Sequence, residues 1–233
     1  MGAEQPPVAV VTGAASGIGA AIAAELSNRG WRIAGLDLQH SEWDAGFRVD
    51  VSDPVAVASA VSDVEQGLGP VEAVVSAAGH YAIVPVSDIS LQDWRKMLHV
   101  HLGGAVNLAR AAAPAMVQRG RGSIVAITSE LAIGGGSGDA HYAAAKGGVI
   151  GLVRSLAAEL APYGVRVNGV APGPTDTPLL PPDSPWRDAD YLATLPSGRL
   201  VVPEEVALVV AFLVEEGTFA TGEILSPNAG AVI

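Results

Sequence analysis

The sequence predicts an α/β fold in which one doubly wound parallel sheet of about seven strands carries helices on both faces. Short apolar segments alternate with segments of helical spacing along the chain. No internal repeat interrupts this alternation. The length of 233 residues fits a single domain, because hydrophobic cores stop growing near ~250 to 300 residues.

The first predicted unit is a strand, a glycine turn and a helix. An apolar strand begins at Val8, the turn TGAASGIG spans 12–19, and a helix spans 20–29 with Gly30 as its end. A helix N-terminus offers unpaired N–H groups, and glycines let a pyrophosphate approach the backbone closely. The turn is therefore a candidate dinucleotide site. Its spacing differs from the commoner G-x-G-x-x-G, and a purely structural turn is the alternative.

Asp37 follows at the end of a second predicted strand over 32–38, about 20 residues beyond the turn. Its carboxylate is placed to accept hydrogen bonds from both ribose hydroxyls of an adenosine. It would also repel a 2′-phosphate at ~4 Å by several kcal/mol at an effective dielectric of ~20. Neither the turn nor 38–39 supplies a cation that reverses this repulsion. The pattern favours NAD over NADP.

The remaining elements continue the alternation. Strands are predicted over 47–51, 71–75, 123–128, 165–170 and 223–227, and helices over 54–68, 90–115, 142–162 and from 203 onward. Asp53 before Pro54 and Ser90 before Asp93 have the pattern of helix starts. The segment over about 176–200 is rich in proline and aspartate. Because long loops in compact domains are usually functional, we expect it to cover the substrate as a lid.

Tyr142 and Lys146 lie four residues apart in an alanine-rich helical segment, so they share one helix face. A phenol of pKa ~10 needs a shift of ~3 units, about 4 kcal/mol, to exchange protons near neutrality. One ammonium at ~4 Å supplies roughly that amount at a dielectric of ~20. The pair is a candidate proton-transfer site. A packed ring beside a solvated amine is the alternative.

Composition narrows the function classes. The net charge of −11 comes without any local lysine or arginine cluster, which argues against nucleic acid and anionic lipid as partners. The absence of cysteine excludes thiol chemistry, zinc-thiolate sites and disulfides, and no metal site is predicted. The N-terminal segment 1–7 has no signal-peptide pattern, and no stretch reaches the ~20 apolar residues of a membrane span. We therefore predict a cytoplasmic protein.

Four motifs stand in one order with compatible spacing: the turn at 12–19, Ser129, Tyr142-x-x-x-Lys146 and Pro172-Gly173. Together they resemble the short-chain dehydrogenase/reductase family, of the NAD type, over nearly the whole chain. The resemblance implies a Rossmann-type fold. It also implies that Tyr142 exchanges the proton at the substrate oxygen, Ser129 orients that oxygen, and Lys146 lowers the pKa of Tyr142 while it binds the nicotinamide ribose. Implied cofactor contacts are Gly13, Ser16, Gly17, Ile18, Gly19, Asp37, Asp50, Val51, Ala78, Gly79, Tyr142, Lys146, Pro172, Gly173, Thr175 and Thr177.

Three positions depart from the family pattern. His101 stands where the family usually has an asparagine that holds a helix bend and a water in a proton path to the lysine. An imidazole can also donate and accept, so His101 is a candidate catalytic residue, with a packed histidine as the alternative. The segment 76–79 (SAAG) lacks side-chain amides that the family often has there. The segment 228–231 (NAGA) lacks its aspartate-glycine-glycine.

These observations predict an NAD-dependent oxidoreductase that moves hydride between a nicotinamide cofactor and a secondary alcohol or ketone, with Tyr142 as general acid or base. The alternatives are an NADPH-dependent 3-oxoacyl thioester reductase and a non-catalytic dinucleotide-binding protein. We expect a small, largely apolar substrate, enclosed by His80, Tyr81, Leu131, Gly136, Leu179 and Trp186. We also expect a homodimer or homotetramer built through small residues of two long helices, or else internal packing of the same residues, namely Gly104, Ala111, Ala145 and Gly148.

Overall fold

The computed structural model describes residues 5–233. Residues 1–4, the start of the segment in which no signal peptide is predicted, lie outside the described residues. The structure confirms the predicted fold class: one parallel sheet of seven strands in the order β3-β2-β1-β4-β5-β6-β7. The strands are β1 (Val8–Thr12), β2 (Arg32–Asp37), β3 (Ala45–Arg48), β4 (Val71–Ser76), β5 (Gly122–Ile127), β6 (Val165–Val170) and β7 (Ile224–Leu225).

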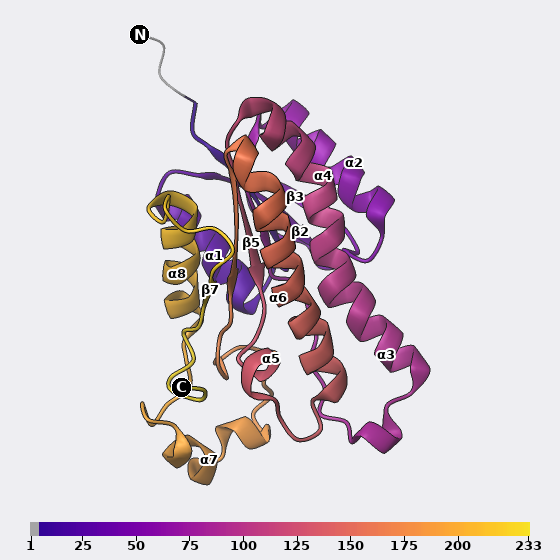
Figure 1. The fold of residues 1–233 in the computed structure, drawn as a ribbon, viewed down its shortest axis with the longest axis vertical. Helices are drawn as coiled ribbons and strands as arrows, with labels where there is room; N and C mark the ends of the chain where they lie inside the picture. Colours follow the sequence, from indigo (N-terminus) through magenta and orange to yellow (C-terminus); the bar gives the residue numbers. More distant parts are fainter. Residues whose placement is uncertain (1–4) are drawn as a thin grey trace.

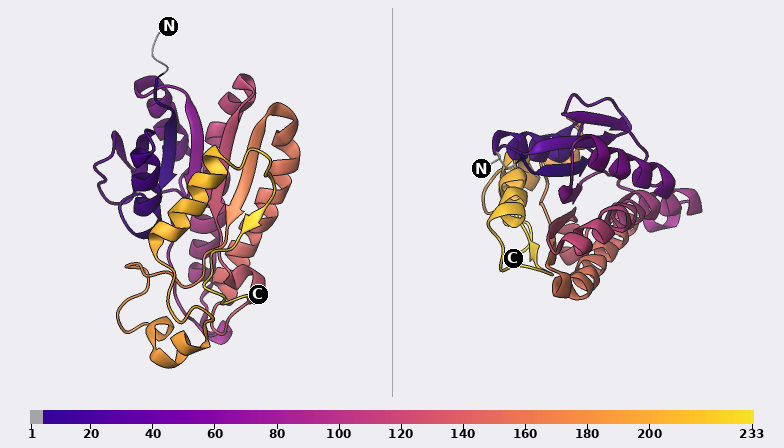
Figure 2. Two further views of the ribbon diagram at one scale, coloured as in Figure 1. Left: turned by 90° about the vertical axis from the view of Figure 1, so that its left-hand side faces the viewer. Right: turned by 90° about the horizontal axis from the view of Figure 1, so that it is seen from above.

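Helices cover both faces of the sheet (Figures 1 and 2). One face packs against α1 (Gly17–Asn28) and α8 (Pro203–Glu215), and the other against α2 (Pro54–Gly67), α4 (Gly104–Arg119) and α6 (Ala140–Leu160). Successive strand residues point to opposite faces, so a strand covered on both sides is apolar at every position. In β1, for example, Val8 and Val10 join one core while Ala9 and Val11 join the other.

The helix predicted over 90–115 is divided in three. It consists of α3 (Leu91–Leu98), a π-helical segment η2 (His99–Gly103) and α4. The Ser90 side chain accepts the backbone N–H of Asp93 at 3.1 Å, as the capping pattern predicts. A π-helical insertion changes the register by one residue and leaves no signal in apolar spacing. Its effect here is to turn His101 into the protein interior, where the side chain is 4% exposed.

Other boundaries shift by a few residues. Strand β3 ends at Arg48, before the predicted end at 51, because Asp50 forms a turn by accepting the backbone N–H of Ser52 at 2.9 Å. The lid segment is not a plain loop, since it contains η4 (Pro185–Arg187) and α7 (Ala189–Thr194). The other short helices are α5 (Leu131–Gly134), η1 (Val86–Asp88) and η3 (Ala161–Tyr163).

The base of the lid is closed by a bridge between Thr175 and Val201. The N–H of Asp176 donates to the Val201 carbonyl at 2.8 Å, and the N–H of Val201 donates to the Pro174 carbonyl at 3.0 Å. The lid therefore leaves and rejoins the domain at adjacent points.

The small residues of the two long helices are largely used inside the chain. A Cβ at Gly104 would lie 2.9 Å from the side chain of Val51, and one at Gly148 would lie 2.9 Å from that of Leu102. Ala145 is fully buried. The sequence left open whether these small residues pack inside the chain or between subunits. Gly104, Ala145 and Gly148 pack inside the chain.

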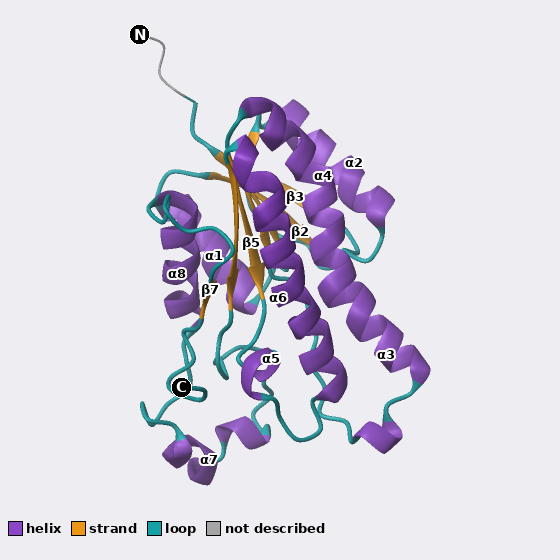
Figure 3. Cartoon of the chain, in the orientation of Figure 1, coloured by secondary structure: helices purple, strands orange, loops and turns teal. Residues whose placement is uncertain are grey.

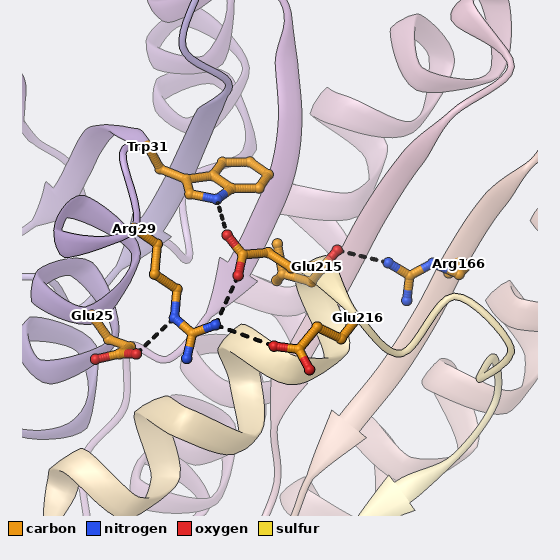
Figure 4. A network of polar contacts seen from close by, with 7 residues as sticks. Glu25, Arg29, Trp31, Arg166, Glu215 and Glu216 are labelled. Carbon is orange, nitrogen blue, oxygen red and sulfur yellow. Dashed lines mark hydrogen bonds and ion pairs between the residues drawn. The ribbon is translucent and has the colours of Figure 1, made fainter.

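A polar cluster joins α1 to the C-terminal end of α8 (Figure 4). Arg29 pairs with Glu25 at 2.7 Å and with Glu215 at 2.9 Å. Nearby, the guanidinium of Arg166 donates to the carbonyls of Leu213, Val214 and Gly217. The carbonyls of Leu213 and Val214 belong to the last turn of α8, where a helix leaves them without backbone partners, so Arg166 acts as a C-terminal cap.

The carboxyl ends of the strands all point to one end of the domain, where α5 and the lid with α7 lie (Figure 3). In an open parallel sheet, ligands bind at this edge. Among residues 5–233, no helix is both long and apolar enough to cross a membrane.

Candidate active site

A cavity of about 530 Å³ opens at the carboxyl ends of the strands. Every residue that the sequence singled out as catalytic or cofactor-binding lines it. The predicted wall residues His80, Tyr81, Leu131, Leu179 and Trp186 line it as well. Gly136 is not among its lining residues within the described chain and instead packs against the carboxylate of Asp139. The topology thus brings residues from 13 to 186 into one site.

The glycine turn is packed too tightly for side chains. Gly13 has φ +71°, and a Cβ there would lie 2.9 Å from Cα of Ala78; a Cβ on Gly19 would lie 2.1 Å from the Gly13 carbonyl oxygen. The hydroxyl of Thr12 accepts the N–H groups of Ala77 at 3.0 Å and Ala78 at 3.1 Å, which joins the turn to the loop after β4. The start of α1 is therefore bare backbone facing the cavity, which suits a pyrophosphate.

Asp37 is fixed at the far end of the cavity. Its carboxylate accepts the N–H of Ala15 at 3.0 Å and the N–H of Gln39 at 2.9 Å. A carboxylate has about four lone-pair sites, so two remain for ribose hydroxyls. Arg48, the register partner of Asp37 on β3, is exposed and is not among the cavity-lining residues that the structure describes.

Ser129, Tyr142 and Lys146 lie at the opposite end. Ser129 follows β5, and the other two residues project from the first turns of α6. The ammonium of Lys146 donates to the Ile127 carbonyl at 2.7 Å and lies 5.8 Å from the centre of the Tyr142 ring. Burial lowers the pKa of Lys146 to about 7.

The pKa of Tyr142 differs from expectation. Burial raises it, the carboxyl groups of Glu130 and Asp139 raise it further, and Ser129 offsets part of the rise. The sequence argument counted one cation and neither burial nor these two carboxyl groups, which are anions at high pH and oppose a phenolate. The predicted lowering of this pKa by Lys146 is therefore not what the structure contains.

His101 packs edge-on against Tyr142, with ring centres 5.3 Å apart. Its Nε2 lies 2.8 Å from the carbonyl oxygen of His80 and 3.3 Å from the backbone nitrogen of the same residue. Because the carbonyl is the closer group, we assign the ring proton to Nε2. Nδ1 is then a buried acceptor without a hydrogen-bond partner in the described protein. Burial, followed by the charge of Lys146, holds the pKa of His101 well below its usual range, so the ring is neutral near pH 7.

The same ring packs against the loop after β4. A Cβ at Gly79 would lie 2.4 Å from Cε1 of His101. The imidazole therefore fills the space beside the glycine. Its bond to the His80 carbonyl ties this loop to η2, a connection that the segment 76–79 does not make with amide side chains.

Sequence comparison with known proteins shows which family this chain belongs to. The sequence model of a family described as enoyl-(acyl carrier protein) reductase matches residues 13–231. The chain belongs to the short-chain dehydrogenase/reductase family. Within that family, it is 35% identical to the 3-oxoacyl-acyl-carrier-protein reductase of Escherichia coli K12, over 96% of both chains. It is 38% identical to the cis-4-hydroxycyclohexanecarboxylate dehydrogenase of Sinomonas cyclohexanicum, over 96% of this chain and 95% of the relative.

A solved structure of another protein has the same fold. The ligand-free aldohexose dehydrogenase of Thermoplasma acidophilum superimposes with a TM-score of 0.90 at 30% identity, covering 97% of this chain and 94% of that one. The short-chain dehydrogenases/reductases that resemble this chain therefore include proteins named for acyl thioester, cyclic alcohol and sugar substrates.

Two carboxyl groups of this short-chain dehydrogenase/reductase were not predicted from the sequence. Glu130 is 5% exposed, lines the cavity and has a pKa that burial raises to about 7. Asp139 is fully buried at the start of α6, where burial also raises its pKa. The available signal was position, since one acid directly follows Ser129 and the other stands three residues before Tyr142.

Asp139 belongs to a chain of hydrogen bonds that reaches the lid. The indole N–H of Trp186 donates to the Tyr81 hydroxyl at 3.0 Å, and that hydroxyl donates to Asp139 at 2.7 Å. The Tyr81 ring packs edge-on against Tyr142 with 5.0 Å between centres. The walls beside Tyr142 thus carry several polar groups, in contrast to the apolar substrate end expected from the sequence.

Proposed function

We propose that the protein is an NAD-dependent oxidoreductase that transfers a hydride between the nicotinamide and a secondary alcohol or ketone. The observation that carries this proposal is the convergence of Ser129, Tyr142 and Lys146 on one end of a cavity whose other end holds Asp37. Membership of the short-chain dehydrogenase/reductase family supports the reaction class. The NAD preference and the residue roles are the parts of the proposal that need testing.

The residues fit a dinucleotide. The glycine turn leaves a cradle that a Cβ would fill, and the first N–H groups of α1 face the same cavity. Gly13 and Gly17–Gly19 would hold the pyrophosphate, Asp37 the adenosine ribose, and Asp50 and Val51 the adenine. Beside the nicotinamide would lie Ala78, Gly79, Pro172, Gly173, Thr175 and Thr177. When bound, the cofactor supplies the hydride acceptor or donor.

In ketone reduction, the Tyr142 hydroxyl donates a proton to the substrate oxygen, and in alcohol oxidation its phenolate accepts that proton. Burial favours the protonated hydroxyl in the ligand-free protein. Lys146 supplies the positive charge on the same helix face, and Ser129 supplies a hydrogen-bonding group for the substrate oxygen. Because Asp37 favours NAD, we propose alcohol oxidation as the physiological direction.

The substrate we propose is a small alcohol that bears further polar groups. Glu130 and Tyr81 lie on the cavity wall near Tyr142, and each keeps an oxygen lone pair that can accept a hydroxyl group of such a molecule. The single N–H of Trp186 is already donated to Tyr81. The solved sugar dehydrogenase of the same fold is consistent with this choice. It replaces the largely apolar substrate expected from the sequence.

The alternative is an NADPH-dependent 3-oxoacyl thioester reductase, which the similarity to the Escherichia coli reductase favours. Asp37 argues against it, since its carboxylate faces the position of a 2′-phosphate. The net charge of −11 also disfavours docking of an acidic carrier protein. A non-catalytic dinucleotide-binding role has little support, because the three catalytic candidates are all present in the cavity.

Steady-state assays with four cofactors and two substrate sets test the proposal. NAD and NADP are combined with cyclohexanol, D-threitol and D-glucose, and NADH and NADPH with cyclohexanone and an acetoacetyl thioester, with absorbance of the reduced nicotinamide as readout. Turnover of an alcohol with NAD supports the proposal. Preference for NADPH with the thioester would replace it by the alternative.

We further propose a cytoplasmic homodimer or homotetramer, as members of this family typically assemble. Light scattering after size exclusion measures the mass. A monomer at micromolar concentration would contradict the assembly part of the proposal without affecting the reaction.

A further inference from the structure

Glu130 stands closer to the proposed chemistry than any other carboxyl group that the structure describes in the cavity near Ser129. It is the residue before α5, its backbone N–H donates to the Pro172 carbonyl at 3.1 Å, and its side chain is 5% exposed. Its Oε2 lies 2.9 Å from the Ser129 hydroxyl oxygen. The side chain is therefore held against Ser129 and does not extend into solvent.

The hydroxyl of Ser129 can form only three hydrogen bonds, one as donor and two as acceptor. A serine hydroxyl has one O–H donor and two acceptor lone pairs. One lone pair accepts the N–H of Leu131 at 3.2 Å. Against an ionised Glu130, the only proton of Ser129 must point to that carboxylate. One lone pair then remains for the cavity, which can accept a bond from an alcohol but cannot donate one to a ketone.

Protonation of Glu130 reverses this arrangement. A carboxylic acid can donate its own proton to the Ser129 oxygen, which fills the second lone pair and releases the serine O–H to turn toward the cavity. A ketone oxygen would then meet two donors, the hydroxyls of Ser129 and Tyr142. Each form of Glu130 thus leaves Ser129 suited to one of the two substrates of the proposed reaction.

We propose that Glu130 is a positioning residue that sets the direction of the Ser129 hydroxyl. The carboxylic acid form of Glu130 then promotes ketone reduction, and the carboxylate form promotes alcohol binding. The proposal rests on the proposed function for its effect on turnover, but the coupling between Glu130 and Ser129 is a property of the protein alone. It identifies a residue that lies outside the predicted catalytic set.

The groups around Glu130 bring its pKa close to neutral pH. Burial raises the pKa of Glu130 to about 7, and Asp139 adds to the rise, while the Ser129 hydroxyl and the N–H groups of Glu130 and Leu131 oppose it. From α6, Tyr142 also faces this carboxyl group, and from α7 Tyr191 does. The pKa of Lys146 is also about 7, so its titration overlaps that of Glu130 and must be separated by mutation.

The coupling is tested first without any substrate. Carboxyl ¹³C NMR of protein labelled at the glutamate side-chain carboxyl follows the titration of Glu130, with Glu130→Gln used to assign the signal. We expect a midpoint near 7 in the wild type. In Ser129→Ala the midpoint rises by about 0.5 to 1 pH unit, because the carboxylate loses a hydrogen-bond donor. A midpoint below about 6, or one that Ser129→Ala leaves in place, would overturn the proposal.

Turnover is tested with cyclohexanone and NADH at pH 6 and 8.5. The kcat/KM ratio between the two pH values is expected to be about thirty in the wild type, since the acid form falls tenfold per pH unit above a pKa near 7. In Glu130→Gln the ratio falls below about three, because the amide does not ionise. Glu159→Gln, an exposed control on α6 roughly 25 Å along the helix from Tyr142, keeps the wild-type ratio.

A wild-type ratio that Glu130→Gln leaves unchanged would assign the pH dependence to a group other than Glu130 and overturn the effect on turnover. If neither cyclohexanone nor the alcohols of the panel react, the proposed function fails. The NMR titration still decides the coupling of Glu130 to Ser129 in that case. The two failures are therefore distinguishable.

Discussion

Replacing Asp37 by asparagine tests whether its charge selects NAD over NADP, because the substitution changes one carboxylate oxygen to an NH₂ group. The substitution keeps the size of the side chain and removes its charge. One of the two backbone donors, the N–H of Ala15 or of Gln39, must then face the amide NH₂, since the carboxylate accepts both in the wild type. We therefore expect a lower melting temperature, by the equivalent of about 1 to 2 kcal/mol, together with a change in selectivity.

The change in selectivity has two parts. A 2′-phosphate at ~5 Å from the Asp37 carboxylate is repelled by about 3 kcal/mol per unit of its charge at an effective dielectric of ~20. Partial solvent exposure reduces the total to roughly 3 kcal/mol, or two decades. Loss of charge-assisted bonds to the ribose hydroxyls weakens NAD by about one further decade. Asp37→Asn should therefore lower the ratio of kcat/KM for NAD to that for NADP by about a thousandfold.

The assay compares initial rates with NAD and NADP on the best alcohol of the panel, with Asp63→Asn on the exposed side of α2 as a control of equal charge change. The control should keep the wild-type ratio. A change below about threefold in Asp37→Asn would refute the electrostatic reasoning. A wild-type preference for NADP would refute it more directly, and would direct attention to Arg48, which neighbours Asp37 in the sheet.

Four further results are expected. Tyr142→Phe should abolish turnover and leave NAD affinity, measured by calorimetry, within about threefold; retained turnover would contradict its catalytic role. Between a folded pKa of about 7 and the ordinary 10.5, the folded protein binds fewer protons at Lys146 than the unfolded chain does, so stability rises with pH there. Lys146→Met should thus raise the melting temperature most below pH ~7, by the equivalent of about 5 kcal/mol, and not near pH ~10.5; equal gains at both would contradict burial of the charge. Arg166→Leu should cost about 2 to 4 kcal/mol in urea unfolding against less than ~1 for the exposed Arg121→Leu. His101→Asn should fold and move the alkaline limb of the pH profile upward, because a smaller side chain lets water reach Lys146; an unchanged profile would make His101 a packing residue.

Sequence reasoning reached the fold and much of the cavity lining because both depend on local patterns. Alternating apolar strands and helices specify a doubly wound sheet, and the carboxyl ends of parallel strands necessarily meet at one edge. Asp37 and Tyr142 are far apart in sequence, yet each follows from its position relative to a strand or helix. For this reason all predicted cofactor contacts line one cavity.

The features that escaped prediction depend on depth and register. Nothing in the sequence reveals that Glu130 is buried, and burial is what raises its pKa and opposes a Tyr142 phenolate. The π-helical segment η2 shifts register without altering the apolar pattern, so the position of His101 against Gly79 was not foreseeable. The lid carries few apolar residues at regular spacing, so its sequence predicts a loop where the structure contains α7.

The closed base of the lid has a consequence for how this enzyme class diversifies. Because Thr175 and Val201 are bridged, the residues between them form an inserted segment whose two ends stay at a fixed separation. Exchange of the segment beyond Thr177 with one from a relative changes the walls around the substrate and leaves the glycine turn, Asp37 and Thr177 in place. Substrate range and cofactor choice can thus evolve, and be engineered, as separate modules on one sheet.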